Sequence, residues 1–335
     1  MRALVVGGTG FIGINLVDAL LGSGAEVVVT KRRRSITAFV RQRRVRFVDA
    51  DLDDSASLHT ALEGIDVMYL AGAHYPRYST QEDEAIATGV RHVRHAAEAA
   101  RSRGIRLVYT SSVGALKSVS DGLAGESDIP ESMPRGSVYR ATKWAMEREL
   151  ERHMDAGLDA VTLLPGACLG PFDARVGTSG IMLAAATGTL PWWVDGLVNV
   201  VDVGDVAQGH IAAAERGRPG ARYCLVGSNL TLGQLLHTVV SRYGGVFPRS
   251  PIAAERARVL ADEAEHAAEL RRGRVPFPRE LVDLLTSGQR VSSAKAEREL
   301  GAAFRPLEET LDRTWKWFVE HHYVPARSAT EGCHE

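Results

Sequence analysis

The feature that most constrains the fold of this chain is a glycine-rich turn directly after its first apolar segment. Leu4–Val6 leads into Gly7-Gly8-Thr9-Gly10-Phe11-Ile12-Gly13, after which apolar residues recur at helical spacing as far as Leu21. Glycines so placed permit a tight turn, close approach of the backbone to a pyrophosphate, and close helix packing. The helix N-terminus adds free N–H groups and a positive dipole. Because strand, turn and helix occur in this order, a purely structural turn is the less favoured interpretation. We predict a dinucleotide-binding turn that uses Gly7, Gly10, Phe11, Ile12 and Gly13.

Short segments rich in Val, Ile and Leu alternate with helical patterns through the first two-thirds of the chain. Strands are expected at Leu4–Val6, Val27–Thr30, Val45–Val48, Val67–Leu70, Leu107–Thr110 and Val161–Leu164. Helices are expected at Phe11–Leu21, Ser55–Glu63, Asp83–Arg101 and Tyr139–Met154. Strands that are apolar throughout are buried on both faces, which is typical of a parallel sheet. The order predicts an α/β fold with a doubly wound (Rossmann) parallel sheet.

The pattern changes after Pro165 to segments interrupted by Gly and Pro, followed by a charged helical stretch at Ala253–Arg272. We expect a dinucleotide-binding domain at 1–167, to which 197–226 returns with strands at Val198–Val201 and Arg222–Val226. A smaller C-terminal substrate-binding subdomain is expected at 168–196 and 227–325. The polar residues 326–335 are expected to form a flexible tail.

Composition excludes several classes of function. The chain has 40 Lys and Arg against 41 Asp and Glu, so no overall field attracts nucleic acid or an anionic membrane. Too few apolar residues precede the first glycines for a signal peptide, and no segment reaches the ~20 apolar residues of a membrane span. Cys168, Cys224 and Cys333 form no metal-binding or paired pattern. We expect a cytoplasmic protein with reduced thiols and no metal.

Basic residues where the second strand ends indicate which dinucleotide is bound. NAD-binding proteins normally place Asp or Glu there to accept hydrogen bonds from the ribose 2′-hydroxyl. This chain has Thr30-Lys31-Arg32-Arg33-Arg34, with no carboxylate in that stretch. Lys31 and Arg32 are therefore expected to hold the 2′-phosphate of NADPH. The alternative is a solvated basic loop, the role expected of Arg41, Arg43, Arg44 and Arg46. Asp51 and Leu52, after the third strand, are placed either to meet the adenine or to cap a helix.

A tyrosine and a lysine begin the helical segment after the fifth strand. Tyr139 and Lys143 are four residues apart, which places the phenol and the ammonium on one helix face. A nearby Lys⁺ lowers the pKa of a phenol from its ordinary value of about 10. Upstream, Ser111 and Ser112 follow the fifth strand, where a hydroxyl can hydrogen-bond a substrate oxygen.

Together with the glycine turn, these residues resemble an extended short-chain dehydrogenase/reductase of the NAD-dependent epimerase/dehydratase superfamily. The resemblance extends to about Glu320 and is closest to the dihydroflavonol-4-reductase-like branch, which includes hopanoid-associated enzymes described as sugar epimerases. It is carried by Tyr109-Thr110-Ser111-Ser112-Val113, Pro165, Gly170-Pro171, Asn199–Ala207 and Ser292–Glu297.

The resemblance implies a role for each residue of the site. Tyr139 is the general acid/base, Lys143 binds the nicotinamide ribose and lowers the tyrosine pKa, and Ser112 orients the carbonyl, with Ser111 the less favoured serine. Further cofactor contacts are expected at Leu70, Ala71, Gly72, Thr110, Ser111, Pro165 and Ala167. The chain departs from the family at Ile86, where Asn is usual, and at Leu164, where many sugar-nucleotide relatives have Arg.

The leading hypothesis is reduction of a ketone or aldehyde by NADPH. The alternatives are an NAD-dependent sugar or nucleotide-sugar epimerase and a non-catalytic NADP(H) sensor or scaffold. An apolar substrate pocket is expected from His74, Tyr75, Tyr78, Val113, Pro134, Cys168, Trp192 and Trp193. Against this, the tryptophans suit ordinary core packing and His74 suits a surface position. Relatives often pair through the helices matching Asp83–Arg101 and Tyr139–Met154, so a homodimer is also expected.

Overall fold

The computed structural model describes residues 1–72, 74–76, 79–119, 121–248, 250–271, 273, 275 and 278–324. The expected tail at 326–335 lies outside this range. Among the described helices, none combines the length and the apolar composition that a bilayer-spanning segment requires.

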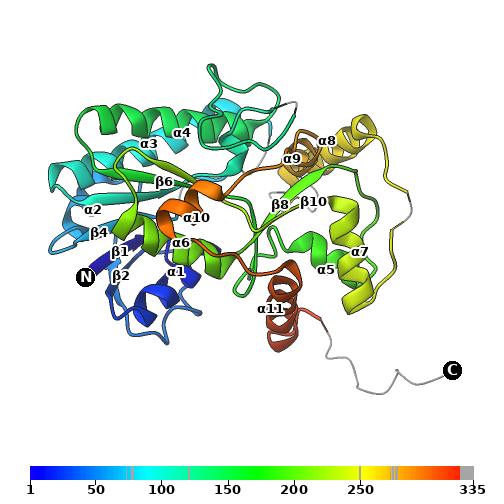
Figure 1. Ribbon diagram of the computed structural model, residues 1–335, viewed down its shortest axis with the longest axis horizontal. Coiled ribbons are helices and arrows are strands. Elements are labelled where there is room, and N and C mark those ends of the chain that lie inside the picture. Colours follow the sequence, from blue (N-terminus) through cyan, green and yellow to red (C-terminus); the bar gives the residue numbers. More distant parts are fainter. Residues whose placement is uncertain are drawn as a thin grey trace.

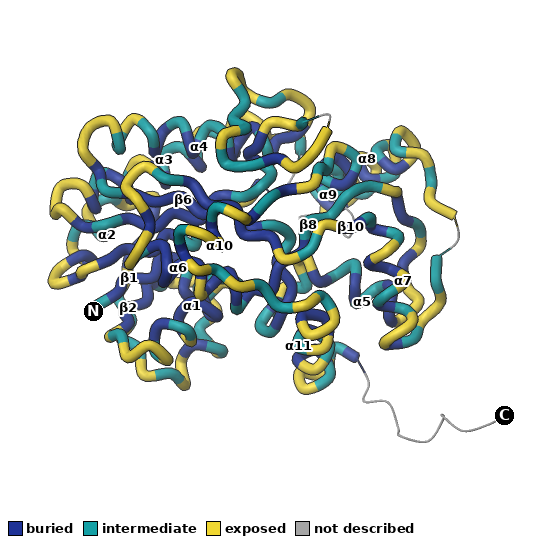
Figure 2. The backbone as a smooth tube through the Cα atoms, in the orientation of Figure 1, coloured by how far each residue is buried: buried dark blue, intermediate teal, exposed yellow. Residues whose placement is uncertain are grey.

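Seven parallel strands form the central sheet, in the order β3-β2-β1-β4-β5-β6-β9. They are β1 (Arg2–Val6), β2 (Glu26–Lys31), β3 (Arg46–Asp49), β4 (Val67–Leu70), β5 (Arg106–Thr110), β6 (Ala160–Pro165) and β9 (Arg222–Leu225). Successive side chains alternate between faces, so Val5 and Val29 enter one apolar cluster and Leu4 and Val28 enter the other. The sheet is buried on both faces (Figure 2), which confirms the predicted doubly wound α/β fold.

Helices cover both faces of this sheet (Figure 1). One face carries α1 (Phe11–Gly22), α6 (Val203–Arg216) and α10 (Ala294–Leu300); the other carries α2 (Ser55–Ala61), α3 (Glu82–Ser102) and α4 (Val138–Asp155). Close packing of α3 on α4 depends on Gly89, because a Cβ there would lie 2.8 Å from the sulfur of Met146. This contact holds the helix that carries Tyr139 against its neighbour.

A smaller module lies beside the central sheet, on the right of Figure 1. Its three-stranded sheet consists of β7 (Ala167–Leu169), β8 (Leu197–Asp202) and β10 (Ser228–Thr231), in the order β10-β8-β7. Its helices are α5 (Gly180–Ala186), α7 (Leu232–Tyr243), α8 (Ala254–Leu270), α9 (Arg279–Thr286) and α11 (Leu307–Glu320). These elements share an apolar core of their own.

Two expectations about chain organisation need correction. The strand at Arg222–Leu225 joins the central sheet beside β6, but the strand expected at Val198–Val201 does not, because β8 pairs with β7 and β10. The edge of β6 is taken by β9, and the chain leaves β6 at Gly166, where the missing Cβ leaves room for the Asn199 carbonyl of β8. In addition α10, expected in the smaller subdomain, packs on the central sheet.

Candidate active site

The segments predicted to bind the cofactor follow the carboxyl ends of parallel strands. The glycine turn follows β1, Lys31 ends β2, Leu70 ends β4, Thr110 ends β5 and Pro165 ends β6. Carboxyl ends of parallel strands meet at one edge of a sheet, where ligands bind in folds of this kind. The structure therefore brings these predicted residues to a common edge.

The glycine turn is closed so tightly that only glycine fits at its key positions. Gly7 has φ +87°, and a Cβ there would collide with the backbone of Gly72 beyond β4. A Cβ on Gly13 would collide with the Gly7 carbonyl oxygen, which also accepts a hydrogen bond from the Gly10 N–H at 2.9 Å. Helix α1 begins at Phe11, with no side-chain cap and no acidic residue in its first turn. These free N–H groups beside a glycine surface fit a dinucleotide pyrophosphate.

A carboxylate does lie beside Lys31, contrary to the expectation from the residues after β2. Asp49 ends β3 opposite Lys31, and its Oδ1 is 2.5 Å from Lys31 Nζ. The parallel register of β2 and β3 causes this pairing between residues distant in sequence. The side chains are 35% and 81% exposed, so the ion pair contributes only about 0–1 kcal/mol. Lys31 can therefore exchange Asp49 for another anion at small cost.

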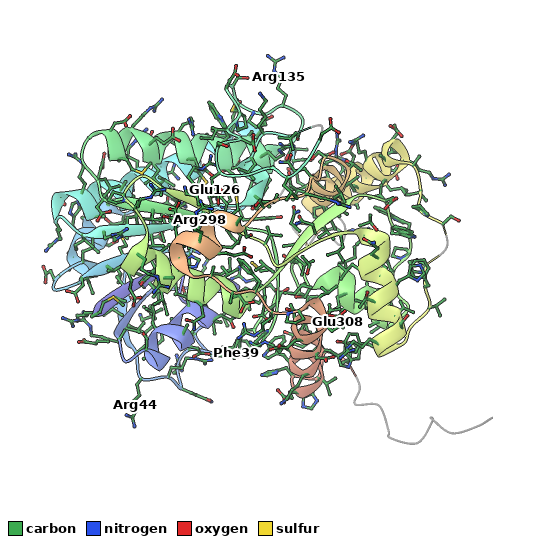
Figure 3. The ribbon with its side chains drawn as sticks, in the orientation of Figure 1. Phe39, Arg44, Glu126, Arg135, Arg298 and Glu308 are labelled. Atoms are coloured by element: carbon green, nitrogen blue, oxygen red, sulfur yellow. The ribbon has the colours of Figure 1, made fainter. Side chains whose placement is uncertain are left out.

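The basic segment after β2 divides into paired and free side chains. Arg32 is exposed, and within the described part of the chain its guanidinium has no partner, whereas its N–H donates to the Ser35 hydroxyl at 2.8 Å. Arg43 is committed to Asp18 of α1, with an N–O distance of 2.6 Å. Arg44 projects into solvent (Figure 3), as expected of the solvated loop. Arg32 is thus available to a 2′-phosphate.

Asp51 and Leu52 divide between surface and core. Leu52 is buried, while Asp51 is partly exposed and accepts a hydrogen bond from the Asp53 N–H at 3.2 Å. The cap of α2 is Asp54, which accepts from the backbone N–H groups of its first turn. Asp51 is therefore not the cap of α2.

Ser112, Tyr139 and Lys143 lie together at the sheet edge. Ser112 caps a short 3-10 helix, η1 (Val113–Ala115), and its Oγ accepts from the Gly114 N–H at 3.1 Å, which leaves the hydroxyl proton available to another acceptor. The Tyr139 ring packs on Gly114, where a Cβ would lie 3.0 Å from Tyr139 Cε1 and 3.4 Å from Ser112 Oγ. One helical turn further along α4, Lys143 Nζ is 5.7 Å from the centre of the Tyr139 ring.

Burial sets the protonation of both α4 residues. Burial raises the pKa of Tyr139, and its hydrogen bond with Ser112 opposes the effect. Burial lowers the pKa of Lys143 to about 8, while the negative charge of Glu147 raises it. Among the described residues, none accepts a hydrogen bond from Lys143 Nζ. An unpaired ammonium beside a neutral phenol fits a site that binds ribose hydroxyls and donates a proton from tyrosine.

The hydroxyls of Ser111 and Thr110 are engaged elsewhere. Ser111 donates to Glu147, whose carboxylate also lies 2.7 Å from the guanidinium of Arg222. Thr110 bonds His210 Nε2 at 2.7 Å, and burial lowers the pKa of that histidine to about 4. Sequence reasoning missed Glu147, although its position four residues beyond Lys143 places it on the same helix face.

The residues predicted to line the substrate pocket fall into two groups, those close to Tyr139, Ser112 or His92 and those in packed regions. Tyr75 is 61% exposed, and its ring centre is 5.2 Å from that of Tyr139. Val113 lies in η1 beside Ser112, and His74 is half-buried, its ring 6.1 Å from that of His92. The remaining residues are in packed regions or undescribed: Cys168 and Trp193 are buried, Trp192 packs against the core of the smaller module, and Tyr78 lies outside the described residues.

Sequence comparison relates the chain to known proteins. Residues 3–225 match the model of the NAD dependent epimerase/dehydratase family. The chain belongs to this family. Among similar proteins, sterol demethylase protein B of Methylococcus capsulatus is 31% identical over 97% of this chain and all of that protein. A Synechocystis protein provisionally named a dihydroflavonol 4-reductase is 30% identical over 96% of this chain and 95% of its own length.

Solved structures of the family share the fold. A nucleoside-diphosphate-sugar epimerase from Pseudomonas aeruginosa is 28% identical, with a TM-score of 0.81 over 97% of this chain and 99% of that one. Other relatives are named reductases and dehydrogenases. The predicted membership of the extended short-chain dehydrogenase/reductase superfamily is confirmed, and the chain is an oxidoreductase of this family.

Proposed function

We propose that this enzyme reduces a ketone or aldehyde to an alcohol with NADPH. The observation that carries the proposal is the grouping of Ser112, Tyr139 and Lys143 at the edge that also holds the glycine turn. A phenol whose pKa is raised by burial stays protonated at neutral pH, which is the form a proton donor needs in the direction of reduction.

Each residue of the group has a distinct part in this reaction. When bound, the nicotinamide supplies the hydride to the carbonyl carbon. Tyr139 donates its phenolic proton to the carbonyl oxygen, and the Ser112 hydroxyl hydrogen-bonds the same oxygen as charge develops on it. Lys143 holds the ribose hydroxyls through its unpaired ammonium. The cofactor is held by the glycine turn at its pyrophosphate and by Arg32 and Lys31 at its 2′-phosphate.

The substrate proposed is a largely apolar carbonyl compound. Tyr75, whose ring lies beside that of Tyr139, is aromatic, and Val113, next to Ser112, is aliphatic. The names of two relatives, 2-alkyl-3-oxoalkanoate reductase and sterol demethylase protein B, support a lipid-like ketone as the substrate of this chain. A substrate panel should therefore begin with 3-oxosteroids and 3-oxoalkanoates, with the elements after Pro165 forming the substrate side of the cleft.

The reaction is tested with Tyr139→Phe. Loss of the phenolic proton should reduce turnover by roughly 10²–10⁴-fold, the usual contribution of a general acid, while NADPH affinity measured by fluorescence changes little. Retention of most activity by Tyr139→Phe on the best substrate would refute the mechanism.

The choice of NADPH is tested with Arg32→Ala and Asp49→Asn. Arg32→Ala should weaken NADPH binding more than NADH binding, because the exposed Arg32 guanidinium has no partner among the described residues. Asp49→Asn should tighten NADPH binding, because it removes a negative charge and releases Lys31. Arg44→Ala, in the solvated loop, is the control and should alter neither affinity. Equal effects of Arg32→Ala on both cofactors would contradict the assignment.

An NAD-dependent sugar epimerase is the second candidate, and the carboxylate of Asp49 is the observation that favours it. In that case NAD(H) should remain bound through purification, and Asp49→Asn should weaken its binding. We also retain the homodimer through α3 and α4 as a proposal, which size-exclusion chromatography tests.

A further inference from the structure

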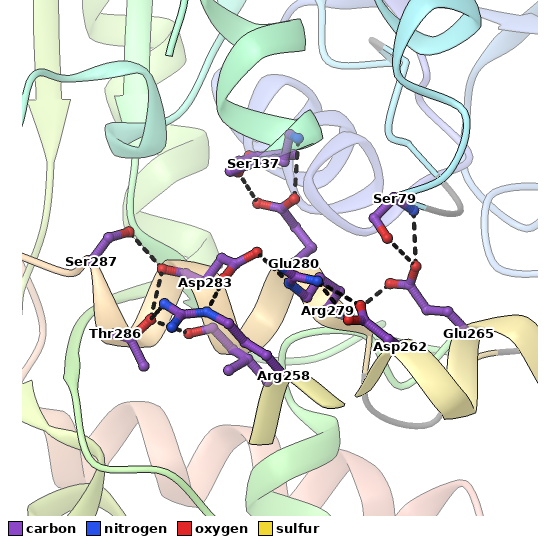
Figure 4. A network of polar contacts seen from close by, with 12 residues as sticks. Ser79, Ser137, Arg258, Asp262, Glu265, Arg279, Glu280, Asp283, Thr286 and Ser287 are labelled. Carbon is purple, nitrogen blue, oxygen red and sulfur yellow. Dashed lines mark hydrogen bonds and ion pairs between the residues drawn. The ribbon is translucent and has the colours of Figure 1, made fainter. Parts of the chain in front are cut away.

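Glu280, near the start of α9, contacts the N-terminus of the helix that carries Tyr139 (Figure 4). Its carboxylate accepts a hydrogen bond from the Ser137 hydroxyl at 2.7 Å and another from the Tyr139 backbone N–H at 3.1 Å. Glu280 is 9% exposed. The first N–H groups of a helix lack partners within it and carry the positive end of the helix dipole, so a buried carboxylate is well placed here.

Two acceptors share the free donors of this helix end. Ser137 is the N-cap of α4, and its Oγ accepts from the Arg140 N–H at 3.2 Å while its own proton goes to Glu280. Glu280 takes the N–H of Tyr139 itself. These contacts hold the first turn of the helix from which the Tyr139 side chain projects.

A second carboxylate, on α8, joins α9 to the segment that contains Ser79. Glu265 of α8 accepts from the Ser79 N–H at 2.9 Å, from the Ser79 hydroxyl, and from the Arg279 N–H at 2.7 Å. Ser79 lies shortly after Tyr75, whose ring contacts that of Tyr139. Helices α8 and α9 thus contact both Ser79, beyond Tyr75, and the start of the helix that carries Tyr139.

Ion pairs join α8 to α9 and make them one unit. Asp283 of α9 accepts from Arg258 of α8 at 2.9 Å and from Arg279 at 3.1 Å, and Arg279 also reaches Asp262 of α8 at 2.7 Å (Figure 4). Glu280, whose carboxylate contacts α4, therefore lies on a helix that ion pairs hold against α8.

The charge of Glu280 acts on the same tyrosine. Burial raises the pKa of Glu280 to about 7, while its hydrogen bonds from Ser137 and Tyr139 oppose the effect. Its negative charge is one of the influences that raise the pKa of Tyr139. Ionisable groups from each of the surrounding elements interact with the Glu280 carboxylate. They are Tyr75 from the loop after β4, Tyr139 and Arg140 from α4, Glu265 from α8 and Asp283 from α9.

We propose that Glu280 is a positioning residue that directs the Tyr139 phenol towards the substrate and favours the protonated form of the phenol. The proposal rests on the proposed function, since it takes Tyr139 as the proton donor. In this proposal, helices α8 and α9 connect the smaller module to α4, the helix that carries the proton donor.

The test uses three variants in the full-length protein. Glu280→Gln removes the charge but retains an oxygen to accept from Tyr139 and an amide to pair with the Ser137 hydroxyl, whereas Glu280→Ala removes the contacts as well. Glu149→Gln is the matched control, because Glu149 is also a buried carboxylate and lies later in α4, where it is ion-paired.

The first measurement is amide hydrogen exchange over residues 137–143. Exchange in this segment should rise roughly ten- to a hundredfold in Glu280→Ala, the factor expected for losing a hydrogen bond to a charged group. It should rise less in Glu280→Gln and stay unchanged in Glu149→Gln. Unchanged exchange in Glu280→Ala would overturn the proposal.

The second measurement follows the phenolate absorbance of Tyr139 against pH in the presence of NADP⁺, with Tyr139→Phe as the blank. In Glu280→Gln the phenolate should form about one pH unit lower than in the natural protein, because a repelling negative charge is gone. An unaltered titration overturns the proposal. If Tyr139→Phe stays active, the proposed function and this role both fail. If it is inactive and the Glu280 variants match the control, this inference alone fails.

Discussion

Replacing Lys143 with methionine is expected to stabilise the cofactor-free protein while removing its activity. Lys143 is 7% exposed, and burial lowers the pKa of its ammonium from 10.5 to about 8. A change of this size corresponds to about 3 kcal/mol of unfolding free energy lost by keeping the charge in the folded protein. Methionine has a similar length and no charge, so Lys143→Met recovers most of this energy at pH 7.

The pH dependence of the unfolding free energy tests whether the buried Lys143 charge is the cause. In the unfolded chain the lysine keeps its proton up to about pH 10.5, whereas in the folded protein it releases it near pH 8. Between these values the unfolded state binds more protons, so the stability of the natural protein rises with pH across this window. Lys143→Met should lack this rise.

Thermal unfolding of the cofactor-free proteins provides the assay. For a chain of 335 residues, 3 kcal/mol corresponds to an increase in Tm of about 4 °C. The control is Lys295→Met, which should not raise Tm, because that ammonium already donates to the Arg222 carbonyl at 2.9 Å. A Lys143→Met variant that melts below the natural protein at pH 7 would refute the reasoning.

Two further pairs of substitutions test the geometry of the site. Gly13→Ala should lower stability by about 1–3 kcal/mol and abolish NADPH binding, because its Cβ meets backbone. Gly22→Ala, where a Cβ meets open space, is the control and should leave stability and NADPH binding intact. Calorimetry and fluorescence titration measure both. Ser112→Ala should lower turnover by roughly 10²–10³-fold with little change in Tm, whereas Ser111→Ala should mainly lower Tm, because it leaves the buried Glu147 short of a donor. The reverse pattern would exchange the roles assigned to the two serines.

Much of the architecture could be predicted because it depends on local patterns. Strands that are apolar on both faces have to lie inside a covered sheet, and a turn with glycine at positions 7, 10 and 13 admits few other structures. The spacing of Tyr139 and Lys143 likewise places them on one face of any helix that contains them. For these features the chemistry of neighbouring residues is sufficient.

Contacts between distant segments were decided only by the tertiary structure. Asp49 meets Lys31 through the register of two parallel strands, and Glu280 reaches Tyr139 across 141 positions of sequence. The prediction that two later strands return to the central sheet was also only partly right, since β9 joins this sheet and β8 does not. The sequence alone determined which groups are present and how neighbours along the chain are arranged. Which charges meet, and therefore how the proton donor is held, depends on packing between elements that no local pattern relates.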